Sequence, residues 1–194
     1  MQTLRAFIKL LRILRLVLSG YWRIKTEFPK LEPHAQARAV EEWSQAMLSM
    51  MGITVRLQGK PSKGPVLMAA NHISWLDILV MHAASHCRFV AKLEIRDWPL
   101  LGVLTAGGGS LFIERTSHRD AKRVVHLMAD ALAKGQVLGV FPEGGTGDGK
   151  TLLPFHGNLL QAAIEAQSPI QPVGLQFLEA HSGLKSFAPC YQIG

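Results

Sequence analysis

Residues 71–77 read Asn71-His72-Ile73-Ser74-Trp75-Leu76-Asp77, and they follow the apolar run Val66-Leu67-Met68-Ala69-Ala70. That run is short and aliphatic, which favours a buried strand. Ser74-x-x-Asp77 matches the capping-box pattern, with Asp77 in place of the usual Glu or Gln at the third helical position. The sequence therefore predicts a strand, a turn that carries His72, and a helix that begins near Ser74.

The spacing of His72 and Asp77 decides whether the two side chains can act together. In an unbroken helix, residues five apart are rotated by roughly 140° from each other, because each residue turns the helix by about 100°. A strand-to-helix turn removes this obstacle, since Asp77 in the first helical turn can reach back to the imidazole. We expect an oriented His72 to act as a general base toward a hydroxyl or a thiol. The alternative is that Asp77 only caps the helix and His72 is a turn residue bonded to the backbone.

Composition narrows the class of partner. The chain has 194 residues, the length of one domain, and only 18% of them are charged, against about 25% in typical soluble proteins. Lys and Arg number 21 and Asp and Glu 14, which gives a sequence pI of about 9.7. Such a chain suits an anionic partner: a membrane surface, nucleic acid or a phosphorylated substrate. Two cysteines, Cys87 and Cys190, form no disulfide framework and indicate a reducing compartment.

The first 20 residues have an amphipathic pattern in which basic side chains gather on one side. They contain no run of roughly 20 apolar residues, so a membrane span is not predicted. We expect an interfacial helix on an anionic leaflet, with Tyr21-Trp22-Arg23 at the level of the headgroups. This interpretation places the protein on the cytoplasmic face of the cell membrane. An ordinary core helix with extended basic side chains is the alternative.

A second helix is predicted between Pro33 and Gly52, because Pro favours the first helical position and Gly favours the residue after the last. Residues 53–58 alternate in polarity, which predicts a half-exposed strand. We therefore divide the chain into N-terminal membrane-associated helices, residues 1–52, and a catalytic domain, residues 53–194.

Three later stretches each combine an apolar run with glycine, proline or polar residues. Gly107–Arg115 places glycines before a strand that ends in Arg115, whose planar guanidinium can bind phosphate or can simply pair with Asp120. Residues 137–146 end in Phe141-Pro142-Glu143-Gly144-Gly145-Thr146, and residues 170–174 form a run that contains Pro172.

With Asn71-His72-x4-Asp77, these stretches form four blocks that resemble, in order and spacing, the glycerolipid acyltransferase family, which includes the lysophosphatidate acyltransferases. The third family block is Phe-Pro-Glu-Gly followed by Thr or Ser, whereas this chain has an additional Gly145 before Thr146. Family members usually continue beyond the position of Gly194, which favours a truncated C-terminus.

The resemblance implies an α/β fold with a mixed central sheet flanked by helices. It implies transfer of a fatty acyl group from acyl-CoA or acyl-carrier protein, as substrate rather than cofactor, to the hydroxyl of 1-acyl-sn-glycerol 3-phosphate. His72 and Asp77 would be catalytic. The expected substrate-binding residues are Asn71, Arg115, Glu143, Gly144, Gly145, Thr146 and Pro172.

Other interpretations stay open at this stage. The acceptor can instead be lyso-ornithine lipid or another lysophospholipid. Gly144-x4-Gly149-Lys150-Thr151 matches the P-loop pattern, although Pro154 and Gly157 interrupt the helix that should follow it. A non-catalytic basic module is a third class, but a nucleic-acid partner is not expected because no reading motif is present. No metal site is expected, because His82 and His86 have no third ligand at a recognisable spacing.

Overall fold

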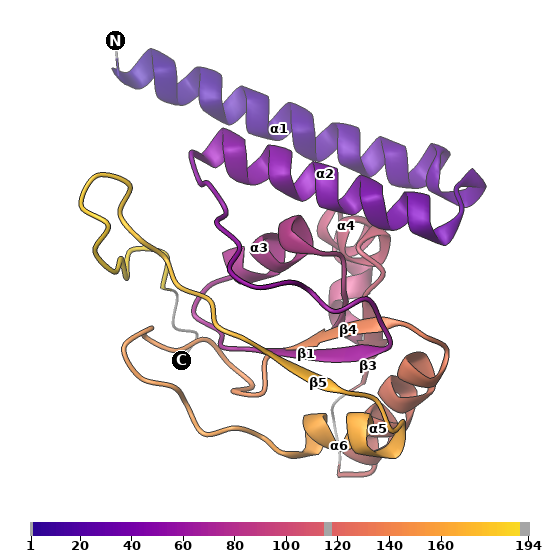
Figure 1. The fold of residues 1–194 in the computed structure, drawn as a ribbon. Helices are drawn as coiled ribbons and strands as arrows, with labels where there is room; N and C mark the ends of the chain where they lie inside the picture. Colours follow the sequence, from indigo (N-terminus) through magenta and orange to yellow (C-terminus); the bar gives the residue numbers. More distant parts are fainter. Residues whose placement is uncertain (1, 115–117, 191–194) are drawn as a thin grey trace. The chain divides into compact units, whose positions relative to one another are not determined.

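The computed structural model describes residues 2–114 and 118–190 (Figure 1). The chain divides into two compact units, each built from several stretches of sequence. The first contains residues 1–61, 79–86 and 91–112, and the second contains residues 62–78, 87–90 and 113–194. No helix in the described part of the chain is both long enough and apolar enough to cross a membrane.

The first unit is helical. Its complete elements are α1 (Gln2–Thr26), η1 (Phe28–Lys30), α2 (Pro33–Met51), η2 (Leu93–Asp97) and α4 (Leu101–Gly107). It also contains residues 79–84 of α3 (Leu76–Ala84). The bounds predicted for α2 are confirmed: Pro33 is its first residue, and Gly52 closes it in the left-handed conformation, with φ of 83°. Helix α1 continues past Gly20 and includes the Tyr21-Trp22-Arg23 segment.

Helices α1 and α2 pack closely because Gly20 has no side chain. A Cβ atom at Gly20 would lie 2.6 Å from the indole Nε1 of Trp43. That indole donates a hydrogen bond of 3.0 Å to the carbonyl of Leu16, so it joins the two helices at their closest approach. A small core of Phe28, Ala39 and Val40 completes the contact.

The second unit contains the greater part of a five-stranded sheet in the order β3-β2-β4-β1-β5. The strands are β1 (Val66–Ala70), β2 (Arg88–Lys92), β3 (Leu111–Ile113), β4 (Val137–Val140) and β5 (Ile170–Val173). Strand β1 pairs in parallel with both β4 and β5, and β2 pairs in parallel with β4. These three ladders are all parallel, where the sequence had predicted a mixed sheet.

Two helices complete this unit, α5 (His118–Ala133) and α6 (Asn158–Glu165). Helix α5 packs on β4 and on α6, and α6 packs on β1 (Figure 1). The core between sheet and helices includes Leu67, Leu138, Met128 and Leu132, all fully buried. The predicted α/β sheet with flanking helices is therefore confirmed.

The strand predicted at residues 53–58 is wrong. Residue burial alternates over positions 53–56, as the sequence suggested, but no neighbouring strand pairs with this segment. An alternating pattern reports which side chains face the protein, and it does not supply the hydrogen-bonding partner that makes a strand.

His82 gives the first unit a predicted sensitivity to acid. Burial, together with the charge of His86, lowers the pKa of the His82 imidazole from 6.5 to about 3. Because the folded-state pKa lies below the unfolded-state value, neutral His82 contributes stability above pH 6.5, and this contribution is lost as the pH falls toward 3. Below pH 6.5 this group alone should lower the free energy of unfolding by about 1.4 kcal/mol per pH unit.

Urea unfolding of the wild type and of His82→Gln across this pH range measures the effect. The variant should show a shallower dependence of unfolding free energy on pH, whereas His34→Gln, at an exposed histidine of α2, should keep the wild-type slope. Identical slopes for wild type and His82→Gln would contradict the prediction.

Candidate active site

Most of the predicted site residues follow the ends of β1 and β4, next to the end of β5. Asn71 and His72 follow β1, Glu143 lies three residues after β4, and Gly174 and Leu175 follow β5. Because these strands are parallel neighbours, their carboxyl ends meet at one edge of the sheet. Ligands of parallel α/β sheets bind at this edge, in the crevice outside the strand ends.

His72 and Asp77 form the hydrogen-bonded pair that the sequence predicted. The Nδ1 atom of His72 lies 2.9 Å from the Oδ2 atom of Asp77. A carboxylate can only accept, so Nδ1 carries the proton and donates it, which leaves the lone pair on Nε2. The Asp77 side chain is fully buried, while 16% of the His72 side chain is exposed. The imidazole can therefore meet a substrate, and the carboxylate cannot.

The same carboxylate oxygen organises the turn. Asp77 Oδ2 also accepts the main-chain N–H groups of Ile73, at 2.7 Å, and Ser74, at 2.9 Å. The bond from Ser74 is the reach-back half of the predicted capping box. The other half is shifted by one residue, because the Ser74 hydroxyl accepts from the N–H of Leu76, at 3.3 Å. Asp77 is thus both the helix cap and the partner of His72, which the sequence had presented as alternatives.

Glu143 holds His72 from the other side. Its Oε1 atom accepts the main-chain N–H of His72 at 2.7 Å, and its Oε2 atom accepts the N–H of Leu153 at 2.7 Å. The carbonyl of His72 accepts the N–H of Gly147, at 2.8 Å. Glu143 was predicted to bind substrate, but both of its oxygens are engaged by the main chain and its side chain is buried. It positions the turn after β1 and the loop after β4 relative to each other.

The His72 ring is also fixed by stacking. Its centroid lies 3.9 Å from that of Phe141, with the two planes inclined by 14°. Phe141 stacks in turn on Phe89, at 5.3 Å between centroids. Phe141 and Glu143 both follow β4, so the Phe-Pro-Glu block supplies an aromatic platform for the imidazole and an acceptor for its main chain.

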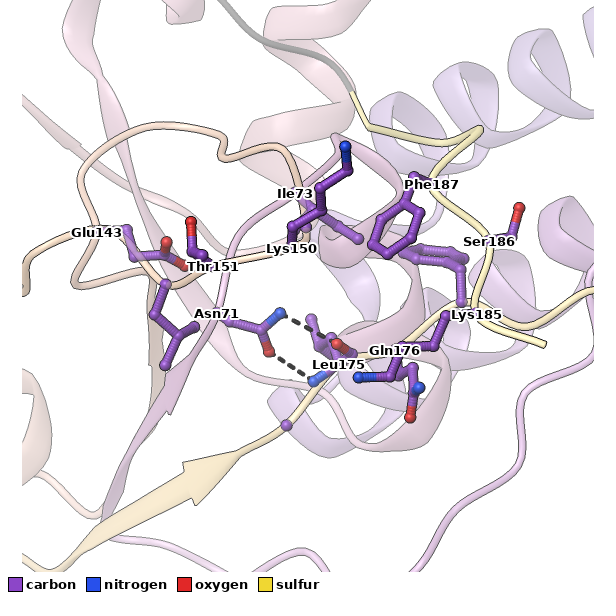
Figure 2. A pocket seen from close by; sticks show the side chains of 14 residues that line it. Asn71, Ile73, Glu143, Lys150, Thr151, Leu175, Gln176, Lys185, Ser186 and Phe187 are labelled. Atoms are coloured by element: carbon purple, nitrogen blue, oxygen red, sulfur yellow. Dashed lines mark hydrogen bonds between the residues drawn. The ribbon is translucent and has the colours of Figure 1, made fainter.

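Asn71 joins the ends of β1 and β5. Its side-chain amide donates to the carbonyl of Leu175 at 3.0 Å and accepts the N–H of Leu175 at 2.6 Å, as Figure 2 shows. This bidentate pairing continues the β1–β5 ladder by one more rung through a side chain. Asn71 was predicted to bind substrate, and here its polar atoms hold the segment that follows β5.

A pocket of about 300 Å³ opens beside this framework (Figure 2). Asn71, Ile73 and Glu143 are part of its lining. The remaining lining comes from the loop after β4 and from the segment after β5: Gly149, Lys150, Thr151, Leu152, Gly174, Leu175, Gln176, Phe177, Lys185, Ser186 and Phe187.

The other predicted binding residues are placed less centrally. Gly144 and Gly145 are exposed in the loop after β4, and Thr146 is half-buried there. Gly144 has φ of 74°, and a Cβ atom there would lie 2.8 Å from the His156 ring, so glycine is needed at this turn. Pro172 lies in β5 opposite Ala69 and does not line the pocket. Arg115 lies outside the described residues.

The P-loop interpretation of residues 144–151 is wrong. A P-loop needs a helix that begins at its Lys-Thr pair. Here the next helix, α6, begins at Asn158, and residues 150–156 form an irregular loop. Lys150 and Thr151 line the pocket instead.

Burial raises the pKa of the Cys87 thiol to about 12, so that side chain is a core thiol rather than a nucleophile. Within residues 2–114 and 118–190, no three His, Cys, Asp or Glu side chains come together in a way that could hold a metal ion.

The sequence missed the part of the pocket lining that comes from the segment after β5. Residues 175–187 show no helical or strand periodicity, and the family blocks end near Phe177. Only the basic Lys185 and the aromatic Phe187 mark this segment as more than a connection.

The model of the family described as "Acyltransferase" matches residues 52–176 of this chain. The chain belongs to the acyltransferase family. It is 37% identical over 162 residues to the 1-acyl-sn-glycerol-3-phosphate acyltransferase of Neisseria meningitidis serogroup B, which covers 82% of this chain and 63% of that protein. It is 34% identical over 183 residues to the lyso-ornithine lipid O-acyltransferase of Pseudomonas aeruginosa, over 91% of this chain and 70% of that protein.

The fold is also similar to that of a solved structure. It is the crystal structure of the 1-acyl-sn-glycerophosphate (LPA) acyltransferase from Thermotoga maritima, with a TM-score of 0.62 and 19% sequence identity. The match covers 84% of this chain and 73% of that chain. At this identity it shows that the fold is shared.

Replacing Glu143 by Gln is expected to lower the free energy of unfolding by about 1 to 3 kcal/mol. The new NH₂ group is a donor, and it would face a main-chain N–H that is also a donor, so this N–H would lose its hydrogen bond. The His72 turn or the Leu153 loop would then lose its acceptor. Urea unfolding measures the effect. Glu32→Gln, at an exposed glutamate before α2, is the matched control. A variant as stable as the wild type would show that Glu143 does not hold the loop.

Proposed function

We propose that this chain carries the acyl-transfer site of an O-acyltransferase that acts on a lyso-lipid. The observation that carries the proposal is the His72–Asp77 pair, with Nδ1 bonded to a buried carboxylate and a partly exposed ring. The four family blocks and the relatives named above support it. The chain spans 63% of the length of its Neisseria meningitidis relative.

In the proposed reaction, Nε2 of His72 takes the proton of the acceptor hydroxyl as that oxygen attacks the carbonyl carbon of an acyl thioester. The C–O bond forms, and the tetrahedral intermediate then collapses with cleavage of the C–S bond. The leaving thiolate receives the proton from the imidazolium, which restores the neutral ring. Asp77 keeps the tautomer that leaves Nε2 free and stabilises the imidazolium.

We propose 1-acyl-sn-glycerol 3-phosphate as the acceptor, with acyl-CoA or acyl-carrier protein as the donor. The product would be phosphatidic acid. Lyso-ornithine lipid is a second candidate acceptor, because the match to the Pseudomonas enzyme extends over 91% of this chain.

We further propose that α1 lies on an anionic membrane surface. Large apolar side chains of α1 are exposed along its length: Leu4, Phe7, Ile8, Leu10, Leu11, Leu14, Leu18 and Trp22. The helix also carries Arg5, Lys9, Arg12 and Arg15, and it has no acidic residue. Exposed apolar residues beside basic ones are typical of helices that lie in a lipid interface.

The catalytic proposal is tested by acyl transfer from palmitoyl-CoA to lysophosphatidate and to lyso-ornithine lipid. Wild type should acylate at least one acceptor, and His72→Ala should lower the rate by about 10²-fold to 10⁴-fold, the usual contribution of a general base. His34→Ala, which removes an exposed histidine of α2, should keep the wild-type rate. Equal rates for wild type and His72→Ala would remove His72 from the mechanism.

The membrane proposal is tested by sedimentation with vesicles that contain phosphatidylglycerol. Phe7→Glu should weaken binding at least about 10-fold, because burial of one Phe side chain contributes about 1.5 to 3 kcal/mol. Ser49→Glu adds the same charge at an exposed position of α2 and should change binding much less. Equal losses in the two variants would indicate a general charge effect rather than insertion of the α1 face.

A further inference from the structure

The imidazole of His72 belongs to a column of three stacked aromatic rings. Its centroid lies 3.9 Å from that of Phe141, and the two planes are inclined by 14°. The Phe141 ring stacks in turn on Phe89, with 5.3 Å between the centroids and 10° between the planes. All three residues belong to the second unit. The imidazole therefore presents one face to a phenyl ring, while its Nδ1 edge meets the carboxylate of Asp77.

The column is anchored in the sheet. Phe89 lies in β2 opposite Gly139 of β4, and its side chain is buried. A Cβ atom at Gly139 would lie 2.8 Å from the Phe89 ring, so the glycine leaves the space that this ring occupies. Phe141 follows Gly139 by two residues, and side chains two residues apart in an extended chain point to the same face of a sheet. The position of the Phe141 ring is thus set by two paired strands.

A phenyl ring responds differently to the two protonation states of the imidazole. The face of the phenyl ring carries partial negative charge, so it attracts a cation that lies over it within about 6 Å. In the proposed acyl transfer, the His72 ring is neutral before the acceptor proton moves to Nε2 and cationic afterwards. The attraction therefore grows as the transition state forms. An interaction that is stronger in the transition state than in the ground state lowers the barrier.

The surroundings of His72 make this attraction effective. Only 16% of the His72 side chain is exposed, so water can reach little of a cationic ring. Cation–π contacts are strongest where the cation is removed from water. The Asp77 carboxylate meets the ring at its edge, and Phe141 meets it at its face. The two side chains can therefore stabilise the same positive charge from different directions.

We propose that Phe141 is a positioning residue that stabilises the imidazolium form of His72 through a cation–π contact. This inference rests on the proposed acyl transfer and adds a second source of charge stabilisation beside Asp77. It also divides the Phe-Pro-Glu block into two roles. Glu143 holds the main chain of His72, and Phe141 acts on the charge of its ring.

Fluorination of Phe141 tests the electrostatic role while the size of the ring changes little. Phe141 is replaced by phenylalanine with one, two or three ring fluorines, which withdraw electron density from the face of the ring in steps. With palmitoyl-CoA and the lyso-lipid that wild type acylates, kcat should fall with each added fluorine. The total loss should be about 3-fold to 30-fold, the range that corresponds to a cation–π contact. The KM for the acceptor should stay close to the wild-type value.

The same fluorinated series at Phe89 is the matched control. This ring is buried and belongs to the same column, but Phe141 lies between it and the imidazole in the stacking order. Fluorination at Phe89 should leave kcat nearly unchanged. Phe141→Leu keeps an apolar side chain and removes the ring, so it should lose at least as much kcat as the trifluorinated protein.

Three results would overturn the inference. One is a kcat that does not depend on the number of fluorines at Phe141, which would leave the ring a packing role alone. Another is an equal fall for the Phe141 and Phe89 series, which would indicate a general effect of fluorine on the core. The third is a change confined to KM, which would assign the Phe141 ring to substrate binding.

A measurement without substrate separates this inference from the proposed function. Diethyl pyrocarbonate modifies only the neutral form of an imidazole, and mass spectrometry of peptides reports the rate at each histidine. At about pH 5.5, where a typical histidine is largely protonated, His72 should react faster in the trifluorinated Phe141 protein than in wild type. The exposed His34 of α2 should react equally in both proteins.

The two measurements together distinguish the possible failures. If His72 reacts faster in the fluorinated protein but wild type acylates no lyso-lipid, the proposed function fails and the cation–π contact stands. If wild type acylates a lyso-lipid while His72 reacts equally in both proteins, the contact fails and the proposed function stands.

Discussion

One buried oxygen, Oδ2 of Asp77, sets both the local fold and the chemistry of this site. Three N–H donors meet it: the imidazole of His72 and the main chain of Ile73 and Ser74. A buried carboxylate is costly unless charge-assisted hydrogen bonds replace its hydration. The turn can therefore close, and α3 can begin, in the geometry that also orients the histidine. The same bonds orient the imidazole and fold this turn.

Glu143 extends this constraint from one strand end to the next. Parallel strands bring the turn after β1 and the loop after β4 to the same edge, but nothing in strand pairing determines the relative position of the two loops. The Glu143 carboxylate does so, because its two oxygens bind main-chain groups of different segments. Asn71 has the corresponding role between β1 and β5. Three of the polar side chains near the histidine thus bond the protein itself, and the groups left to face a ligand lie farther out.

The elements that could be predicted from the sequence are those determined by short local patterns. The strand, turn and helix around His72 follow from an apolar run and a capping pattern only a dozen residues long, and the bounds of α2 follow from Pro33 and Gly52. Residues 53–58 were misjudged because strand formation depends on a partner far away in the chain. Lys150 matched a nucleotide motif in its short pattern, and Pro154 and Gly157 already argued against the helix that this motif requires. The segment after β5, which includes Lys185, has no periodicity, so only the folded chain brings it to the pocket.

The division of the chain between the two units affects what a truncated protein would lose. The first unit is assembled from three separate stretches, and residues 91–112 are made long after α1 and α2. Helix α1 packs on α4 as well as on α2. A cut after residue 52 would therefore remove the helix that packs on α4, and it would uncover the part of α4 that this helix now contacts. The N-terminal helices are therefore part of the packing of the first unit as well as its exposed surface.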